Sequence, residues 1–256
     1  MKERGMIFNG EMVRALLDGR KTQTRRIMKL QPKPSKSRPG DFWFSSKKLE
    51  SMVHVSDLAP GNSPIADYHL FIQEHCCPFG AVGDRIWVRE TWATLGNEDG
   101  CCVDWEGNLC KGDERSAARI YRASCEQRPG DYGLWSIPDD AYWKPHTKEH
   151  KFEGAWRPSI HMPRWASRIM LEITNVRVER LNAISEEDAE AEGIDMEALY
   201  DSQDCYDCIA DHNMTGRPTV TGAFKYLWES IYGEEGWKSN PWVWVIEFKR
   251  VEGGAA

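Results

Sequence analysis

The chain has 256 residues, of which 41% are hydrophobic and 29% are charged, and its formal net charge is -7 at pH 7. These proportions are those of an ordinary globular protein and exclude low-complexity and fibrous chains. The acidic balance also excludes attraction of nucleic acid by the whole molecule, so any contact with RNA or DNA has to come from local basic patches.

The composition along the chain also bears on its location. No apolar run reaches the roughly 18 residues that span a bilayer, and the first ten residues, MKERGMIFNG, lack the apolar core of a signal peptide. We therefore expect a cytoplasmic protein with no membrane partner. In that reducing compartment, the eight cysteines are expected to be buried thiols or metal ligands rather than disulfides.

The first predicted element is a helix. Residues 10–19, GEMVRALLDG, place apolar side chains on one helical face and end in a glycine, which predicts a helix that stops at Gly19. The following KTQTRRI predicts a strand. The junction between them, DGRKTQTRR at 18–26, is strongly basic. It is either a solvated charged turn or strand edge, or a site for a polyanion or a nucleoside.

Three stretches are expected to be insertions. Residues at about 30–75 begin with a tract rich in Pro, Ser, Lys and Gly that predicts a long loop or a partly ordered insertion. A Gly-Asp turn then leads into a strand within 81–93, AVGDRIWVRETWA. Residues at about 94–160 are polar with few periodic signals, and residues at about 195–220 contain a turn-rich linker.

The C-terminal part has the clearest elements. Residues 168–181 predict a long strand, and 184–194 predict a helix with Ser185 as its N-cap. An amphipathic helix over 223–233 and a strand over 241–251 follow. Strands outnumber helices without a βαβ rhythm, so we expect an α+β fold built on a small mixed β-barrel or a curled mixed sheet, with flanking helices. A single domain over 1–251 with a short tail at 252–256 is the expected organisation.

Four of these segments carry a resemblance to a known family. They are GRKTQTRR after a helix, GDRIWV, LEITNVRVERLNAISEEDAEAEGI and WVWVIEFKRV, and they cover somewhat under half of the chain. In this order they resemble the ASCH family of the PUA-like superfamily, in the long form common in phages and prophages. The resemblance implies a PUA-like β-barrel with long insertions.

Within that family, the functional motifs are most similar to those of bacterial N(4)-acetylcytidine amidohydrolases. In those enzymes a threonine is the nucleophile, a lysine accepts its proton and a glutamate donates one. The matching positions here are Thr24, Lys21 and Glu192. The resemblance implies a metal-independent hydrolase, without a cofactor, that removes the acyl group from the exocyclic amine of an N(4)-acylcytidine-type nucleoside.

The chemistry places demands on these residues. A threonine hydroxyl needs a base, and a lysine serves as that base only when its pKa falls well below about 10.4. Burial and neighbouring cations lower it, and the basic junction supplies such cations. Positive charge there also stabilises an oxyanion. The residues expected to bind the substrate, through charge, stacking and hydrogen bonds to the base edge, are Arg20, Arg26, Arg89, Glu90 and Trp92.

Two other functions use the same basic cleft. A PUA-like RNA-binding module needs only a cation at Lys21, so it would tolerate arginine there, whereas a hydrolase needs an amine that can lose its proton. A ribonuclease would cleave RNA and release no acetate. The acyl group, the choice between a free nucleoside and a base within RNA, and the oligomeric state are left open by the sequence.

A metal site is the remaining candidate. Cys205 and Cys208 form a C-x-x-C pair, with His212 four residues further on. A zinc ion would need another ligand, from Cys101, Cys102, Cys110 or the cluster of His75, Cys76 and Cys77. No second pair with clean spacing is present, and the aspartate-rich neighbourhood fits a surface loop as well. We therefore predict no metal site.

Overall fold

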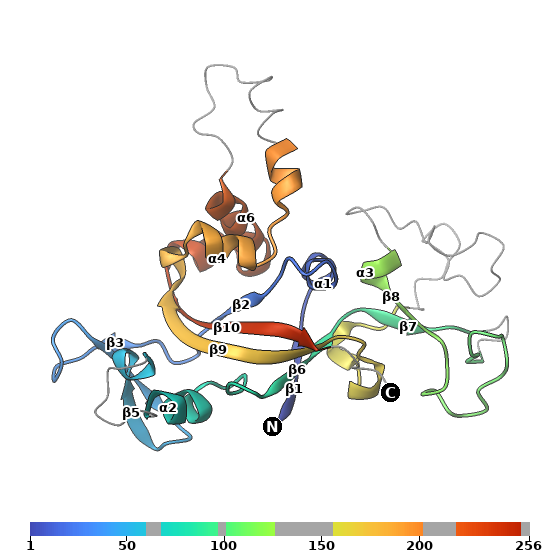
Figure 1. The fold of residues 1–256 in the computed structure, drawn as a ribbon, viewed down its shortest axis with the longest axis horizontal. Coiled ribbons are helices and arrows are strands. Elements are labelled where there is room, and N and C mark those ends of the chain that lie inside the picture. Colours follow the sequence, from blue (N-terminus) through green and yellow to red (C-terminus); the bar gives the residue numbers. More distant parts are fainter. Residues whose placement is uncertain (60–67, 97–100, 126–155, 202–218, 252–256) are drawn as a thin grey trace. The chain divides into compact units, whose positions relative to one another are not determined.

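The computed structural model describes residues 1–59, 68–96, 101–125, 156–201 and 219–251 (Figure 1). They belong to two compact units between which the chain passes several times. The first unit contains residues 1–4, 15–85 and 172–250, and the second contains residues 5–14, 86–171 and the C-terminal end from 251. The expectation of a single domain over 1–251 stays a prediction.

The fold is mixed α+β, as expected, but its main sheet does not close into the expected barrel. Within the described residues this sheet has five strands in the order β1-β6-β9-β10-β2, with β1 and β2 at its edges. The bounds are β1 Glu3–Ile7, β2 Gln23–Ile27, β6 Arg85–Arg89, β9 Met170–Arg180 and β10 Trp242–Val251.

The helices form largely where the sequence predicts them. Ser185 caps α4, because its hydroxyl accepts a hydrogen bond from the Asp188 N–H at 3.1 Å. Gly233, with φ at 74°, ends α6. The bounds are α1 Gly10–Leu17, α2 Tyr68–Cys76, α3 Arg122–Cys125, α4 Glu186–Ala191, α6 Val220–Tyr232 and α7 Glu234–Lys238. Short 3₁₀ turns occupy Val55–Leu58, Ser159–His161, Arg164–Ala166 and Leu181–Ala183. None of the helices in the described ranges has the length and apolar character that crossing a bilayer requires.

The first expected insertion is more ordered than its composition indicates. Of the two expectations for this tract, a long loop does not form, because a three-stranded sheet occupies part of it, followed by α2. Phe44 pairs with Val53, and both are buried. The strands of this sheet are β3 Lys33–Pro34, β4 Phe42–Ser46 and β5 Ser51–His54.

The expected strand within 81–93 is split in two. It breaks at Glu90 and Thr91, after which β7 (Trp92–Thr94) pairs with β8 (Arg119–Tyr121) in a separate sheet. The second insertion thus contains β8 and α3 in its described part. The third begins with a helical turn at residues 196–201 and continues outside the described residues.

The hydrophobic core of the first unit joins the region of α4 to α6 and β10, next to the candidate site. Leu181, Ile184 and Ala189 pack with Phe224 and Trp228 of α6 and with alternate residues of β10. Each large apolar side chain buried in this way contributes on the order of 1.5–3 kcal/mol. This packing holds α4 against the sheet where β2 pairs with β10, as Figure 1 shows.

Candidate active site

The site is built where the start of β2 meets the end of α4. The positive φ of Gly19, 78°, turns the chain after α1, and the Lys21 N–H then donates to the Ala15 carbonyl at 3.0 Å. Lys21 forms an isolated antiparallel bridge with Glu192, and the Thr22 N–H donates to the Ala191 carbonyl at 2.9 Å. The backbone therefore places Lys21 and Glu192 side by side although they are far apart in sequence.

Their side chains make a direct buried ion pair. Lys21 Nζ donates to Glu192 Oε2 at 2.7 Å and to the Glu192 carbonyl oxygen at 2.7 Å. The two side chains are 0% and 2% exposed. Two charges removed from water in this way need close, hydrogen-bonded geometry to be tolerated. The structure thus brings together the predicted base and the predicted acid.

A glycine makes this close approach possible. Gly193 has φ at 97°, and a Cβ added to it would lie 2.8 Å from Ala15 Cβ and 2.9 Å from Lys21 Cβ. Its backbone therefore packs directly against the base of the Lys21 side chain. Any larger residue would push these elements apart.

Arg25 belongs to the same cluster; the sequence predicts its positive charge near Lys21, but not its direct contact with Glu192. Its Nη1 donates to Glu192 Oε1 at 3.2 Å, and its Nη2 contacts Asp188 at 2.8 Å and Glu179 at 3.1 Å. The Arg25 side chain is fully buried. Glu192 is thus held between two cations, one on each carboxylate oxygen.

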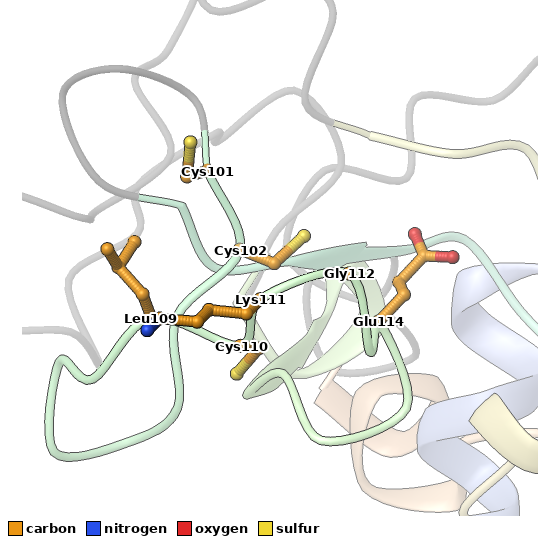
Figure 2. A pocket seen from close by; sticks show the side chains of 7 residues that line it. All are labelled: Cys101, Cys102, Leu109, Cys110, Lys111, Gly112 and Glu114. Carbon is orange, nitrogen blue, oxygen red and sulfur yellow. The ribbon is translucent and has the colours of Figure 1, made fainter.

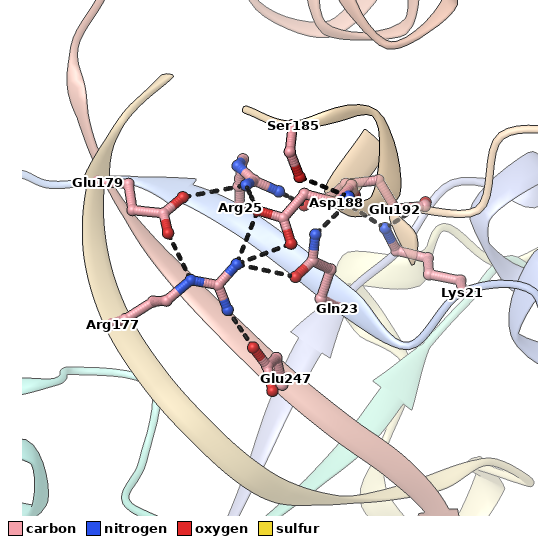
Figure 3. A network of polar contacts seen from close by, with 9 residues as sticks. All are labelled: Lys21, Gln23, Arg25, Arg177, Glu179, Ser185, Asp188, Glu192 and Glu247. Atoms are coloured by element: carbon pink, nitrogen blue, oxygen red, sulfur yellow. Dashed lines mark hydrogen bonds and ion pairs between the residues drawn. The ribbon is translucent and has the colours of Figure 1, made fainter. Parts of the chain in front are cut away.

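A second layer surrounds Arg25 (Figure 3). Arg177 on β9 donates to both Asp188 oxygens at 2.9 Å and to Glu179 at 2.5 Å, and it also contacts Glu247 on β10. Gln23 Nε2 donates to the Asp188 carbonyl oxygen at 2.6 Å. These groups come from β2, β9, α4 and β10, so only folding brings them together. The sequence gives no local signal for this arrangement, because residues 21–26 (KTQTRR) are all polar.

The electrostatics of the cluster follow from its burial. Burial lowers the pKa of Lys21 below its ordinary value; Glu192 opposes this shift, and the charges of Arg26 and Arg25 add to it. Burial acts to raise the pKa of Asp188, but the hydrogen bonds and charges of Arg177 and Arg25 outweigh it and hold that pKa below its ordinary value. The pKa of Lys21 is thus shifted downward, as the expected chemistry requires of a lysine that acts as a base.

Thr24 is close in sequence but directed elsewhere. It lies within β2 opposite Ile246 of β10 and is 1% exposed. Strand alternation points its side chain to the face opposite that of Gln23 and Arg25, and Arg26 shares the face of Thr24. The structure therefore does not bring the Thr24 hydroxyl to the Lys21–Glu192 pair.

Arg20 lies at the rim of the cluster. It donates to the Gly193 carbonyl oxygen at 2.8 Å and to Asp18 at 3.1 Å, and its side chain is 34% exposed. The contact with Gly193 ties Arg20 directly to the chain beside Glu192.

Three of the other expected substrate-binding residues, Arg89, Glu90 and Trp92, belong to the second unit and have partners there. Arg168 holds the Glu90 carboxylate through two contacts of 2.9 Å, and burial raises the pKa of Glu90 despite that cation. Trp92 is 1% exposed and stacks edge-on with Trp165 at 5.5 Å. Arg89 Nε donates to the Ser159 carbonyl oxygen at 3.1 Å. Each of the three residues therefore has a partner within its own unit: an ion pair for Glu90, a backbone hydrogen bond for Arg89 and an aromatic contact for Trp92.

The zinc candidates Cys205, Cys208 and His212 lie outside the described residues. Within the described ranges, no group of three or more His, Cys, Asp or Glu residues is arranged to hold a metal ion. Among the described cysteines, Cys77 is fully buried, and burial raises its pKa to about 11, which suits an inert thiol.

Comparison with known proteins gives no match to a protein-family model, a curated protein or a solved structure. The resemblance to the ASCH family therefore rests on the four sequence segments described above.

Proposed function

We propose that this chain is a PUA-like protein of the ASCH type that hydrolyses the exocyclic amide of N(4)-acylcytidine-type nucleosides. The observation that carries the proposal is the contact of 2.7 Å between Lys21 Nζ and Glu192 Oε2, across 171 positions of sequence. These are the positions that the resemblance assigns to the base and the acid. A solvated charged turn would need neither the burial nor the partner.

The Lys21–Glu192 pair can supply both the base and the acid of the reaction without a net gain or loss of a proton. Moving one proton from Lys21 Nζ to Glu192 Oε2 converts an ion pair into a neutral amine beside a neutral carboxylic acid. Burial favours that neutral form because it removes two charges from a dry site. Arg25 favours the charged form by stabilising the carboxylate, so it sets the balance between the two states.

The proposed reaction begins with Thr24. Its oxygen attacks the acyl carbon while the Lys21 amine takes the hydroxyl proton, and positive charge nearby stabilises the oxyanion. Glu192 then gives its proton to the exocyclic nitrogen as the bond between carbon and nitrogen breaks. Cytidine leaves, and water hydrolyses the threonyl ester to release the carboxylic acid.

This chemistry requires a local opening at the start of β2. The Lys21 and Glu192 side chains are 0% and 2% exposed, and Thr24 points to the other face of the strand. A substrate that separates the start of β2 from the end of α4 would expose the pair. The same movement would have to bring the Thr24 hydroxyl within reach of it.

The full burial of the pair favours a second candidate, a binding module without catalysis. Lys21 and Arg25 both hydrogen-bond to the Glu192 carboxylate, so this cluster holds together without a ligand. In a PUA-like RNA-binding module these residues would hold β2 against α4, and the RNA would contact other parts of the surface.

The test is incubation of the purified protein with N(4)-acetylcytidine and with longer N(4)-acyl derivatives, followed by chromatography for released cytidine. A labelled single-stranded RNA is incubated in parallel to detect binding or cleavage. Release of cytidine supports the hydrolase. RNA binding without cytidine release supports the binding module, and RNA fragments without released carboxylate indicate a ribonuclease.

A further inference from the structure

Two cysteines occupy opposed backbone positions on the two arms of a tight hairpin in the second unit. Val103 and Leu109 form an antiparallel bridge, and the Cys110 N–H donates to the Cys102 carbonyl oxygen at 2.9 Å. In this register Cys102 and Cys110, one step further from the turn on each arm, are directly opposite. Side chains of opposed residues lie on the same face of an antiparallel pair.

The turn of this hairpin is held by its own hydrogen bonds. Asp104 Oδ1 accepts from the N–H of Glu106 at 3.0 Å and from that of Asn108 at 2.8 Å. The Asp104 N–H donates to the Asn108 carbonyl oxygen at 3.0 Å, and Gly107 supplies the positive φ of 84° that the turn needs. The opposition of the two cysteines is therefore built into the local sequence.

The spacing suits a disulfide. Opposed residues of a hydrogen-bonded antiparallel pair have Cα atoms about 5.5 Å apart, within the range of about 4.4–6.8 Å found for disulfides. The thiols are at present reduced and point in different directions in Figure 2. Cys102 Sγ lies 3.7 Å from the Thr94 hydroxyl, and Cys110 Sγ lies 3.8 Å from the Asn108 carbonyl oxygen. Such weak contacts do not prevent rotation about χ1.

The pair is also open to small molecules. Both cysteines are half-buried, and both line a cavity of about 360 Å³ together with Cys101, Lys111 and Glu114 (Figure 2). A tripeptide thiol or disulfide can approach such a partly exposed pair, in contrast to the fully buried Cys77.

We propose that Cys102 and Cys110 are a redox-modification site, a thiol pair that a low-molecular-weight disulfide such as oxidised glutathione converts into an intramolecular disulfide. The Cys102 thiolate attacks one sulfur of oxidised glutathione, which releases one glutathione and leaves the other bound to Cys102. The Cys110 thiolate then attacks the Cys102 sulfur and releases the second glutathione. Two protein thiols lose two electrons and two protons, and the glutathione disulfide gains them.

Desolvation and the nearby charge of Asp104 raise the pKa of Cys110 above its ordinary value, so its thiolate is scarce at neutral pH. The final product does not depend on the order of the two steps, because whichever thiol first takes up glutathione, the opposed thiol displaces it. The product locks the hairpin at residues 102–110, which forms one side of the cavity. This inference is independent of the proposed hydrolase activity.

The test uses the full-length protein and its Cys101→Ser, Cys102→Ser and Cys110→Ser variants. Each is treated with oxidised glutathione, alkylated and digested with trypsin. Residues 90–111 form one tryptic peptide, which contains Cys101, Cys102 and Cys110 but no other cysteine. Its mass therefore reports on this site alone. A parallel treatment in urea gives the rate for the unfolded chain, which lacks the hairpin.

In the Cys101→Ser variant we expect peptide 90–111 to become two hydrogens lighter, without an adduct. The Cys110→Ser variant should instead retain glutathione on Cys102. Oxidation in the native protein should be faster than in urea by on the order of tenfold, because the hairpin holds the thiols together. The proposal is overturned by equal rates in the two conditions, by adducts alone in the Cys101→Ser variant, or by loss of two hydrogens in the Cys110→Ser variant. The last result would indicate a bond between Cys101 and Cys102.

Discussion

Glu192 gives one carboxylate oxygen to each of two buried cations, Oε2 to Lys21 at 2.7 Å and Oε1 to Arg25 at 3.2 Å. The first contact creates a pair that can exchange a proton, and the second fixes the orientation of the carboxylate. This arrangement has consequences for the stability and for the activity of the protein.

Lys21 should make the stability of the protein depend on alkaline pH. Because burial lowers its pKa in the folded state, the unfolded chain binds more protons at this residue than the folded chain does. The free energy of unfolding should therefore rise with pH from the lowered pKa up to the ordinary value of 10.5. A Lys21→Met variant should lack this contribution. Its free energy of unfolding, measured with urea, should therefore fall further behind that of the wild type as the pH rises through this range. Stability curves that run parallel with pH would contradict a lowered pKa of Lys21.

Asp188 should stabilise the protein at neutral pH and cease to do so in acid. Asp188→Asn weakens the contacts with Arg25 and Arg177, and we expect a loss of about 2–3 kcal/mol at pH 7. Because the pKa of Asp188 is lowered in the folded state, this contribution is present above the unfolded pKa and is lost as pH falls through the folded pKa. Urea unfolding at pH 7 and at pH values below 3.8 measures the difference.

The matched control for that prediction is Glu186→Gln, an exposed change in the first turn of the same helix. It should alter the free energy of unfolding by only about 0.5 kcal/mol. Equal effects of the two substitutions would show that the cluster around Arg25 contributes nothing specific.

Gly193 should be the least replaceable glycine in the site. Gly193→Ala combines a positive φ with a Cβ placed 2.8 Å from Ala15 Cβ, so it should destabilise the protein by about 1–3 kcal/mol beyond the backbone strain. Gly19→Ala is the control, because Gly19 has φ at 78° but no atom within 4 Å of an added Cβ. Its cost should be the strain alone, about 1–2 kcal/mol. Thermal or urea unfolding compares the two variants, and equal losses would rule out the packing argument.

The elements around the site were largely predictable from sequence, because each has a local signal. The N-cap at Ser185, the glycine stops at Gly19 and Gly233, and the continuous apolar run at the start of β10 each act over a few neighbouring residues. The three-stranded sheet after residue 30 was missed because Phe44 and Val53 gain their partners only through pairing across a turn. The expected barrel also depended on long-range closure, which a pattern along the chain does not specify.

The same distinction between local signals and long-range contacts applies to the candidate site. Lys21 and Glu192 were identified through the resemblance to the ASCH family, and the structure places them in contact. Arg25 was expected only as one of the cations near Lys21, and Asp188 and Arg177 were not identified as site residues, since each is an ordinary charged residue until strand and helix meet. The side-chain direction of Thr24 was predictable in principle, because an odd-numbered separation from Lys21 in an extended segment puts the two on opposite faces.

Thr24 therefore needs its own test. Thr24→Val keeps the shape and removes the hydroxyl, and Thr24→Ser keeps the hydroxyl. If Thr24 is the nucleophile, the valine variant should lose cytidine release by several orders of magnitude while the serine variant retains part of it. Both rates are measured with N(4)-acetylcytidine. An active valine variant would assign the attack to water, with Lys21 as its base.

The most direct measurement of the central claim is cytidine release from N(4)-acetylcytidine by the wild type and by a Lys21→Arg variant whose folding is checked by urea unfolding. Arginine keeps the positive charge beside Glu192 but cannot give up its proton. We expect cytidine release by the wild type and none by a folded Lys21→Arg variant. Equal turnover by the two proteins would contradict the role of Lys21 as a base, and no turnover by the wild type with any N(4)-acyl derivative would contradict the proposed hydrolase itself.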